Sequence, residues 1–118
     1  KKMQGFERQI LVKFLCMLNT VKLFHWKTRS YATHKATDEL YSKLNEHIDS
    51  FVEIMLGKDG SRVNLTGIKS IRLNDYVSQE QLKREIESFR KYLTDDLNKN
   101  KINSHISFQL LNINLLHL

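Results

Sequence analysis

The sequence predicts an all-α fold, in which four helices form one domain over residues 1–118. The chain contains no proline and four glycines, and these are the two residue types that most often interrupt helices. Its apolar residues recur at intervals of three and four in four separate segments, which is the spacing of a helix with one apolar face. The 118 residues suffice for one core. Four helices with their longest link in the middle are typical of a four-helix bundle.

The first predicted helix runs from about Met3 to Lys27. Its apolar face consists of Leu11, Phe14, Leu15, Leu18 and Val21. His25 continues this face, so we expect its side chain to point toward the packed side of the helix, next to Trp26. A histidine in such a position is more often a core residue with satisfied hydrogen bonds than a metal ligand. The spacing alone leaves both interpretations open.

The second predicted helix follows a break at residues 27–29 and has two distinct faces. Ser30 or Thr33 could cap its start, and it runs to about Leu56, with Gly57 as its stop. Its apolar face consists of Leu40, Leu44, Ile48, Phe51 and Met55. This face is expected to pack against the core.

Residues 57–77 are the least helical part of the chain, and we expect a long connection there that contains a short helical turn. Ser78 and Gln81 form a capping-box pattern, which predicts a third helix from about Gln79 to Leu97. Its apolar face consists of Leu82, Ile86, Phe89, Leu93 and Leu97. A fourth helix, short or truncated, is expected from about His105 to His117, with Ile106, Leu110, Ile113 and Leu116 on one side.

The second helix also carries a stripe of metal-ligand side chains. At about 100° per residue, and with His34 set at zero, Asp38 falls near 40°, Asp49 near 60° and Glu53 near 100°. Imidazole and carboxylate ligands together suit iron, manganese or zinc. Because the stripe lies beside the apolar face, it is expected at an edge of the bundle, facing another subunit. A complete site would then combine His25 or His34 of one chain with Asp49 or Glu53 of its neighbour. The alternative is an ordinary solvated helix face.

Several function classes lack their motifs in this chain. Cys16 is the sole cysteine, so the chain cannot form an internal disulfide and lacks the cysteine cluster that is typical of a structural zinc site. The sequence holds no Gly-rich phosphate loop, no zinc-protease HExxH and no Glu-x-x-His pair on two helices. No stretch approaches the length of a membrane span, and no secretory signal is visible, so a cytoplasmic protein is expected.

The net charge of +6 is concentrated in the first third of the chain. Lys1, Lys2, Arg8 and Lys13 could neutralise phosphates of a nucleic acid. They form no base-reading motif, so such binding would be non-specific and would weaken steeply with salt. Ordinary solvated helix faces are the alternative interpretation of these residues.

The residues of the stripe and of the preceding break form a recognisable pattern. The pattern consists of His25-Trp26, His34-x-x-x-Asp38 and Asp49-x-x-x-Glu53. It resembles the ferroxidase signature of the Dps family, the mini-ferritins that protect DNA in starved cells. The resemblance is specific over residues 18–56, and small Dps-like proteins of large DNA viruses look similar there. The loop between His25 and His34 is about three residues shorter than is usual in the family, and the last helix is short.

The resemblance implies a ferritin-like four-helix bundle and a di-iron site at a two-fold interface. Asp49 and Glu53 of one subunit would hold iron, and His25, His34 and Asp38 of the other would complete the site. Two Fe(II) ions would be oxidised there by hydrogen peroxide or oxygen. The family assembles twelve subunits, built from dimers, into a shell that stores the ferric mineral.

Three further interpretations accompany this one. Trp26 could accept an oxidising equivalent beside the site, or it could be a core or interface aromatic. The protein could be a non-specific DNA-compacting protein with little metal activity. It could also be an assembly scaffold whose metal site is degenerate.

Overall fold

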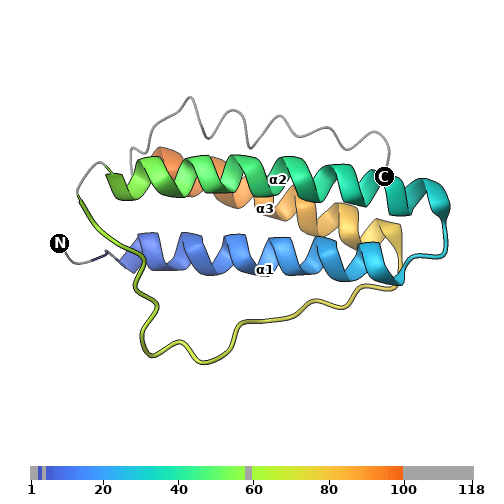
Figure 1. Ribbon diagram of the computed structural model, residues 1–118, viewed down its shortest axis with the longest axis horizontal. Helices are drawn as coiled ribbons and strands as arrows, with labels where there is room; N and C mark the ends of the chain where they lie inside the picture. The colour runs from blue at the N-terminus through green and yellow to red at the C-terminus, as the bar shows by residue number, and fades with distance from the viewer. Residues whose placement is uncertain (1–2, 4, 58–59, 100–118) are drawn as a thin grey trace.

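The computed structural model describes residues 3, 5–57 and 60–99, and this part of the chain is all-α (Figure 1). It contains α1 (Gly5–Lys27), α2 (Tyr31–Gly57) and α3 (Gln79–Lys99). These bounds confirm the first three predicted helices to within two residues at each end. The predicted fourth helix lies outside the described residues. Across the described ranges, no helix is both long and apolar enough to cross a membrane.

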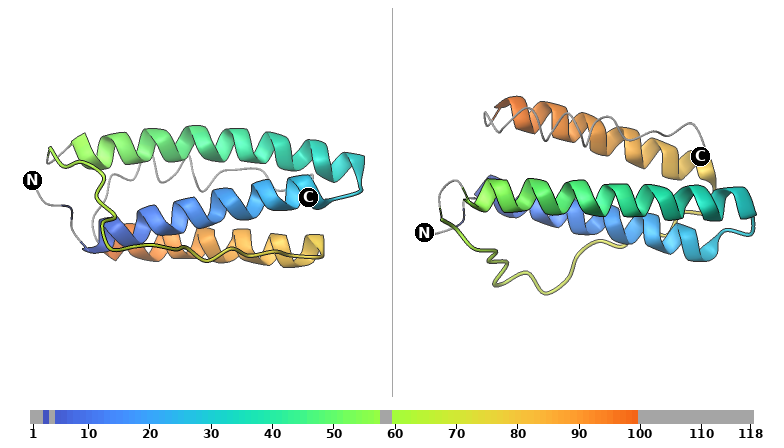
Figure 2. Two further views of the ribbon diagram at one scale, coloured as in Figure 1. Left: turned by 60° about the horizontal axis from the view of Figure 1, so that its bottom comes forward. Right: turned by 45° about the horizontal axis from the view of Figure 1, so that its top comes forward.

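The three helices are arranged around α1. α1 and α2 form an antiparallel hairpin, and α3 packs against α1 (Figures 1 and 2). The chain then crosses the length of the bundle between α2 and α3, so these two helices run in the same direction. No described Cα atom of α2 lies within 8 Å of one in α3. In the described part of the chain, α2 and α3 therefore pack mainly on α1, and a hydrogen bond between Gln79 and Thr33 connects their first turns.

Phe14 of α1 lies where the three helices meet. Its side chain is 1% exposed, and its ring packs edge-on against Phe51 of α2 at 5.3 Å and Phe89 of α3 at 5.9 Å, between centroids. Edge-to-face geometry suits the charge distribution of aromatic rings. The predicted apolar faces are buried at Leu11, Phe14, Leu18, Val21, Leu40, Leu44, Ile48, Phe51, Met55, Leu82, Ile86, Phe89 and Leu93.

Among the predicted apolar residues whose burial the structure describes, Leu15 is the one that was assigned wrongly, since it is 42% exposed. It follows Phe14 directly, so it points about 100° further around the helix and away from the core.

A tight turn joins α1 to α2. The N–H of Thr28 donates to the carbonyl of Phe24 at 2.9 Å, which closes α1. Ser30 caps α2, because its Oγ accepts from the N–H of Thr33 at 3.2 Å and its carbonyl accepts from the N–H of His34 at 2.9 Å. Of the two predicted caps, Ser30 is therefore confirmed, whereas Thr33 lies inside the helix and is buried.

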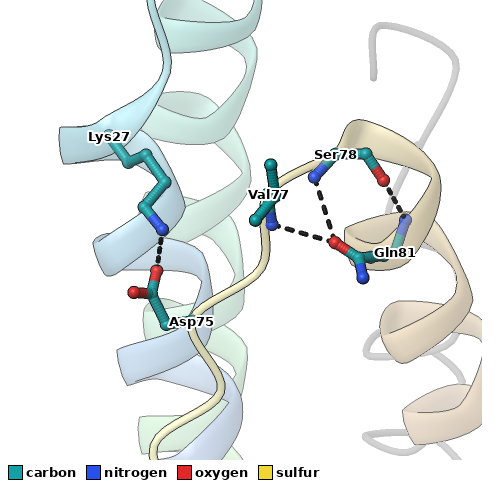
Figure 3. Close-up of polar contacts among 5 residues, drawn as sticks. All are labelled: Lys27, Asp75, Val77, Ser78 and Gln81. Carbon is teal, nitrogen blue, oxygen red and sulfur yellow. Dashed lines mark hydrogen bonds and ion pairs between the residues drawn. The ribbon is translucent and has the colours of Figure 1, made fainter.

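The crossover, residues 60–78, is irregular and contains a reverse turn in place of the predicted helical turn. The N–H of Ile68 donates to the carbonyl of Leu65 at 3.0 Å, and Gly67 has a φ of 93°. This φ fits the third position of a type II turn, which favours glycine. An ion pair between Lys27 and Asp75 attaches the end of the crossover to the end of α1 (Figure 3).

The capping box at the start of α3 is confirmed (Figure 3). The N–H of Gln81 donates to Ser78 Oγ at 3.2 Å, and Gln81 Oε1 accepts in return from the N–H of Ser78 at 3.1 Å. The same oxygen accepts from the N–H of Val77 at 2.9 Å. Backbone donors that the helix cannot satisfy are thereby paired.

We expect Ser78→Ala to lower the free energy of unfolding by about 1 kcal/mol, because it removes the cap of α3. Urea denaturation followed by circular dichroism would measure this change. Ser42→Ala is the matched control, since Ser42 is exposed in the interior of α2 and alanine has the higher helix propensity. An equal loss in both variants would contradict the capping role.

Candidate metal centre

His25 and His34 lie face to face at the turn between α1 and α2. His25 belongs to the last turn of α1, and His34 belongs to the first turn of α2. Their rings are stacked, with 3.9 Å between centroids and 21° between planes. His25 is buried, as its place on the apolar face predicted, and His34 is exposed. The short turn therefore brings together two imidazoles that are nine residues apart in the chain.

Each histidine bonds the backbone of the other through Nδ1. His25 Nδ1 lies 2.8 Å from the carbonyl oxygen of His34, and His34 Nδ1 lies 3.0 Å from the carbonyl oxygen of His25. A carbonyl oxygen only accepts hydrogen bonds, so both Nδ1 atoms carry the proton. In the neutral imidazole the lone pair is then on Nε2. Metal-binding histidines commonly have this arrangement, in which one nitrogen is held by a carbonyl and the other is available to the metal.

Thr37 of α2 contacts the His25 ring and helps to fix its position. Its Oγ1 lies 3.1 Å from His25 Nδ1 and itself donates to the carbonyl of Thr33 at 2.7 Å. Thr37 is fully buried, and the Gln79 side chain donates to the hydroxyl of Thr33. The start of α3 therefore supports the residues that orient His25.

Sequence reasoning missed Thr33, Thr37 and Gln79 as supporting residues. A signal was present, because Thr33 and Thr37 lie one helical turn apart on the buried side of α2, where polar residues are uncommon. The contribution of Gln79 depends on a contact between residues 46 apart and had no local signal.

The three predicted carboxylate ligands are exposed along α2. Asp38 lies one turn after His34, whereas Asp49 and Glu53 lie about 22 and 28 Å from His34 along the helix at 1.5 Å per residue. Among the described residues, no hydrogen bond or ion pair engages these carboxylates, and no cluster of three or more His, Cys, Asp or Glu side chains could hold a metal. One chain therefore brings together His25 and His34, and it does not bring Asp49 and Glu53 to them.

Trp26 points into solvent beside the histidine pair and is 71% exposed. The interpretation of Trp26 as a core aromatic is therefore wrong for the single chain, while a place at a subunit interface or a redox role stays a prediction. Tyr31, at the start of α2, is also exposed.

The structure describes two of the four residues that are predicted to bind nucleic acid. Arg8 lies on α1, where its Nη2 donates to the carbonyl of Thr66 at 2.9 Å. Lys13 is exposed, and its Nζ lies 5.0 Å from the centroid of the Tyr92 ring. Lys1 and Lys2 lie outside the described residues. Non-specific binding of nucleic acid stays a prediction.

Residues 25–112 match a family of unknown function, DUF5856, and because this is more than half of the chain, the protein belongs to that family. The matched region begins at His25 and includes all five predicted metal ligands. No curated protein and no solved structure matches the chain.

We expect both His25 and His34 to be Nδ1–H tautomers at a pH at which their rings are neutral. Long-range ¹H–¹⁵N correlation spectra of the labelled protein distinguish the two ring nitrogens. His47 is the internal control, because no hydrogen bond within the described part of the chain fixes its tautomer. An Nε2–H tautomer at His25 or His34 would contradict the assignment of Nε2 as the metal-binding atom.

Proposed function

We propose that this protein is a Dps-like mini-ferritin, which binds and oxidises Fe(II) at a site shared by two subunits and stores the ferric product. The observation that carries the proposal is the histidine pair. Both Nδ1 atoms bond backbone carbonyls, which leaves the Nε2 atom of each stacked ring available to a metal ion. Iron is the substrate of this reaction.

The chain path supports a ferritin-like bundle. Ferritin-like folds have one long crossover, and here it lies between α2 and α3, which run in the same direction (Figure 1). α2 and α3 both pack on α1, and no described Cα atom of α2 lies within 8 Å of one in α3.

The spacing of the ligands supports a site completed by a two-fold axis. In an isologous interface, residue i of one subunit contacts residue j of the other, and j contacts i. If α2 packs antiparallel to its copy about an axis between Lys43 and Leu44, His34 lies opposite Glu53. The same register places Asp38 opposite Asp49. One register therefore brings both acids of one subunit to the histidines of the other, and a dimer contains two such sites.

The outer face of the α1–α2 hairpin suits this interface. Leu15, Lys22 and Trp26 lie on one stripe of α1, at intervals of seven and four. Lys22 Nζ lies 4.2 Å from the centroid of the Tyr41 ring, and Tyr41 follows His34 by seven residues on α2. The exposed apolar side chains of Leu15 and Trp26 thus lie on the same side of the hairpin as the ligand stripe. Exposed apolar residues that group in this way mark interaction surfaces.

The proposed ligand set suits iron oxidation. Each site would hold two imidazoles and three carboxylates, and anionic oxygen ligands stabilise Fe(III) relative to Fe(II). Two Fe(II) ions give one electron each to hydrogen peroxide, which takes up two protons and leaves as two water molecules. Trp26 lies next to His25 in the chain, and we propose that it accepts an oxidising equivalent from the neighbouring iron site.

We expect Asp49→Asn with Glu53→Gln to retain the fold and to slow iron oxidation more than about tenfold, since even outer partners of metal ligands contribute that much. Anaerobic Fe(II) titration followed by a peroxide pulse, recorded by ultraviolet absorbance, measures the rate. Glu39→Gln with Glu46→Gln is the matched control, because it removes the same charge from exposed positions of α2 outside the stripe. Equal rates in both double variants would overturn the site assignment.

A mixing experiment tests whether the site is shared between subunits. His25→Ala with His34→Ala, and Asp49→Asn with Glu53→Gln, should each oxidise iron more than about tenfold more slowly than the parent when alone. Refolded together in equal amounts, they should regain about a quarter of the parent activity, because half of the dimers are mixed and each mixed dimer has one intact site. No recovery from a mixture that assembles normally would contradict a shared site.

A further inference from the structure

A cavity of about 800 Å³ lies between α1, α3 and the crossover, separate from the histidine pair. Its apolar wall includes Val12 and Met17 of α1, Ile68 of the crossover and Phe89 of α3. This volume is within the range of small-molecule binding sites, which are mostly apolar with a few placed polar groups. The cavity is therefore large enough for a small organic molecule.

A polar cluster forms one side of the cavity. Tyr76 OH donates to Glu85 Oε2 at 2.9 Å, and Asn74 Nδ2 lies 3.5 Å from Glu85 Oε1. Asn74 also approaches Cys16 Sγ at 3.6 Å, and Cys16 Sγ donates to the carbonyl of Arg72 at 3.2 Å. Burial, and then the hydrogen bond to Glu85, raise the pKa of Tyr76, so its hydroxyl stays protonated at neutral pH. Glu85, the one carboxylate that lines the cavity, is therefore hydrogen-bonded to uncharged donors.

More positively charged side chains than carboxylates line the cavity. Arg8, Lys13 and Arg72 all line the cavity. Within the described residues none of them pairs with a carboxylate: Arg8 bonds a carbonyl, and Lys13 lies over the Tyr92 ring. The cavity therefore combines an apolar wall with an excess of positive charge that lacks a carboxylate partner.

We propose that this cavity binds a small organic anion with an apolar body, such as a medium-chain carboxylate. The apolar body would contact Val12, Met17 and Phe89, and the anionic head would be bound by Arg72 and Lys13. Hydrogen bonds to charged groups are among the stronger polar contacts. The inference is independent of the iron site, since no predicted metal ligand lines the cavity.

Titration of the full chain with decanoate, followed by NMR of ¹³C-labelled methionine methyl groups, tests the proposal. Met17 lines the cavity, and its methyl signal should shift in a saturable manner. Met55 is also buried but lies on α2 outside the lining, so its signal should stay in place. Decylamine and decanol have similar apolar bodies without the negative charge, and they should bind more weakly than decanoate by about tenfold or more.

Lys13→Gln with Arg72→Gln should weaken decanoate binding by about tenfold or more, because two charged donors are lost. Both side chains are exposed, so the fold should be retained. Lys35→Gln with Lys43→Gln removes the same charge from exposed positions of α2 and should leave binding unchanged. The proposal is overturned if Met17 does not shift, if decylamine binds as well as decanoate, or if the two double variants bind alike.

Discussion

The packing of Phe14 is the contact on which the positions of the other elements depend. α2 and α3 both pack on α1 in the described part of the chain, and the Phe14 ring lies edge-on to Phe51 of α2 and to Phe89 of α3. Truncation of a buried phenylalanine typically costs about 3–5 kcal/mol, because the cavity left behind cannot collapse fully. The polar features lie where this aromatic core ends: the histidine pair at one end of the hairpin, and the cavity along the side of α1.

The two halves of the candidate site differ in how strictly they are held. His25 is fixed by its own turn, by Thr37 and by the backbone of His34, whereas Asp49 and Glu53 lie on an open helix surface without partners in the described part of the chain. Sites need ligands held within a fraction of an ångström, and a second shell supplies this for His25. In the proposed dimer, the neighbouring subunit would order the carboxylates.

Most of the described fold could be predicted from local patterns. The spacing of apolar residues gave the three helices, and the pattern of Ser78 and Gln81 gave the start of α3. The prediction that Leu15 is buried was wrong, because residues spaced three and four apart cover a wider stripe of the helix surface than the part that becomes buried. In the site, the burial of His25 followed from its spacing. Its stacking on His34 depends on the geometry of the tight turn between α1 and α2. The support from Gln79 and the cavity beside Cys16 depend on how the crossover returns along α1, and local sequence does not encode this path.

The attachment of the crossover to the hairpin has a consequence for how the molecule opens. Gln79 contacts Thr33 and Asp75 contacts Lys27, so the turn that carries the histidines is tied to residues 46 and 48 positions away in the chain. Proteins open in cooperative units, and these contacts place the turn in one unit with the start of α3, so we expect its amide protons to exchange together with those of α3. Contacts between distant residues also form late, because the loop between them must close first. The histidine turn therefore gains its full support only when the crossover has closed and the start of α3 has docked beside it.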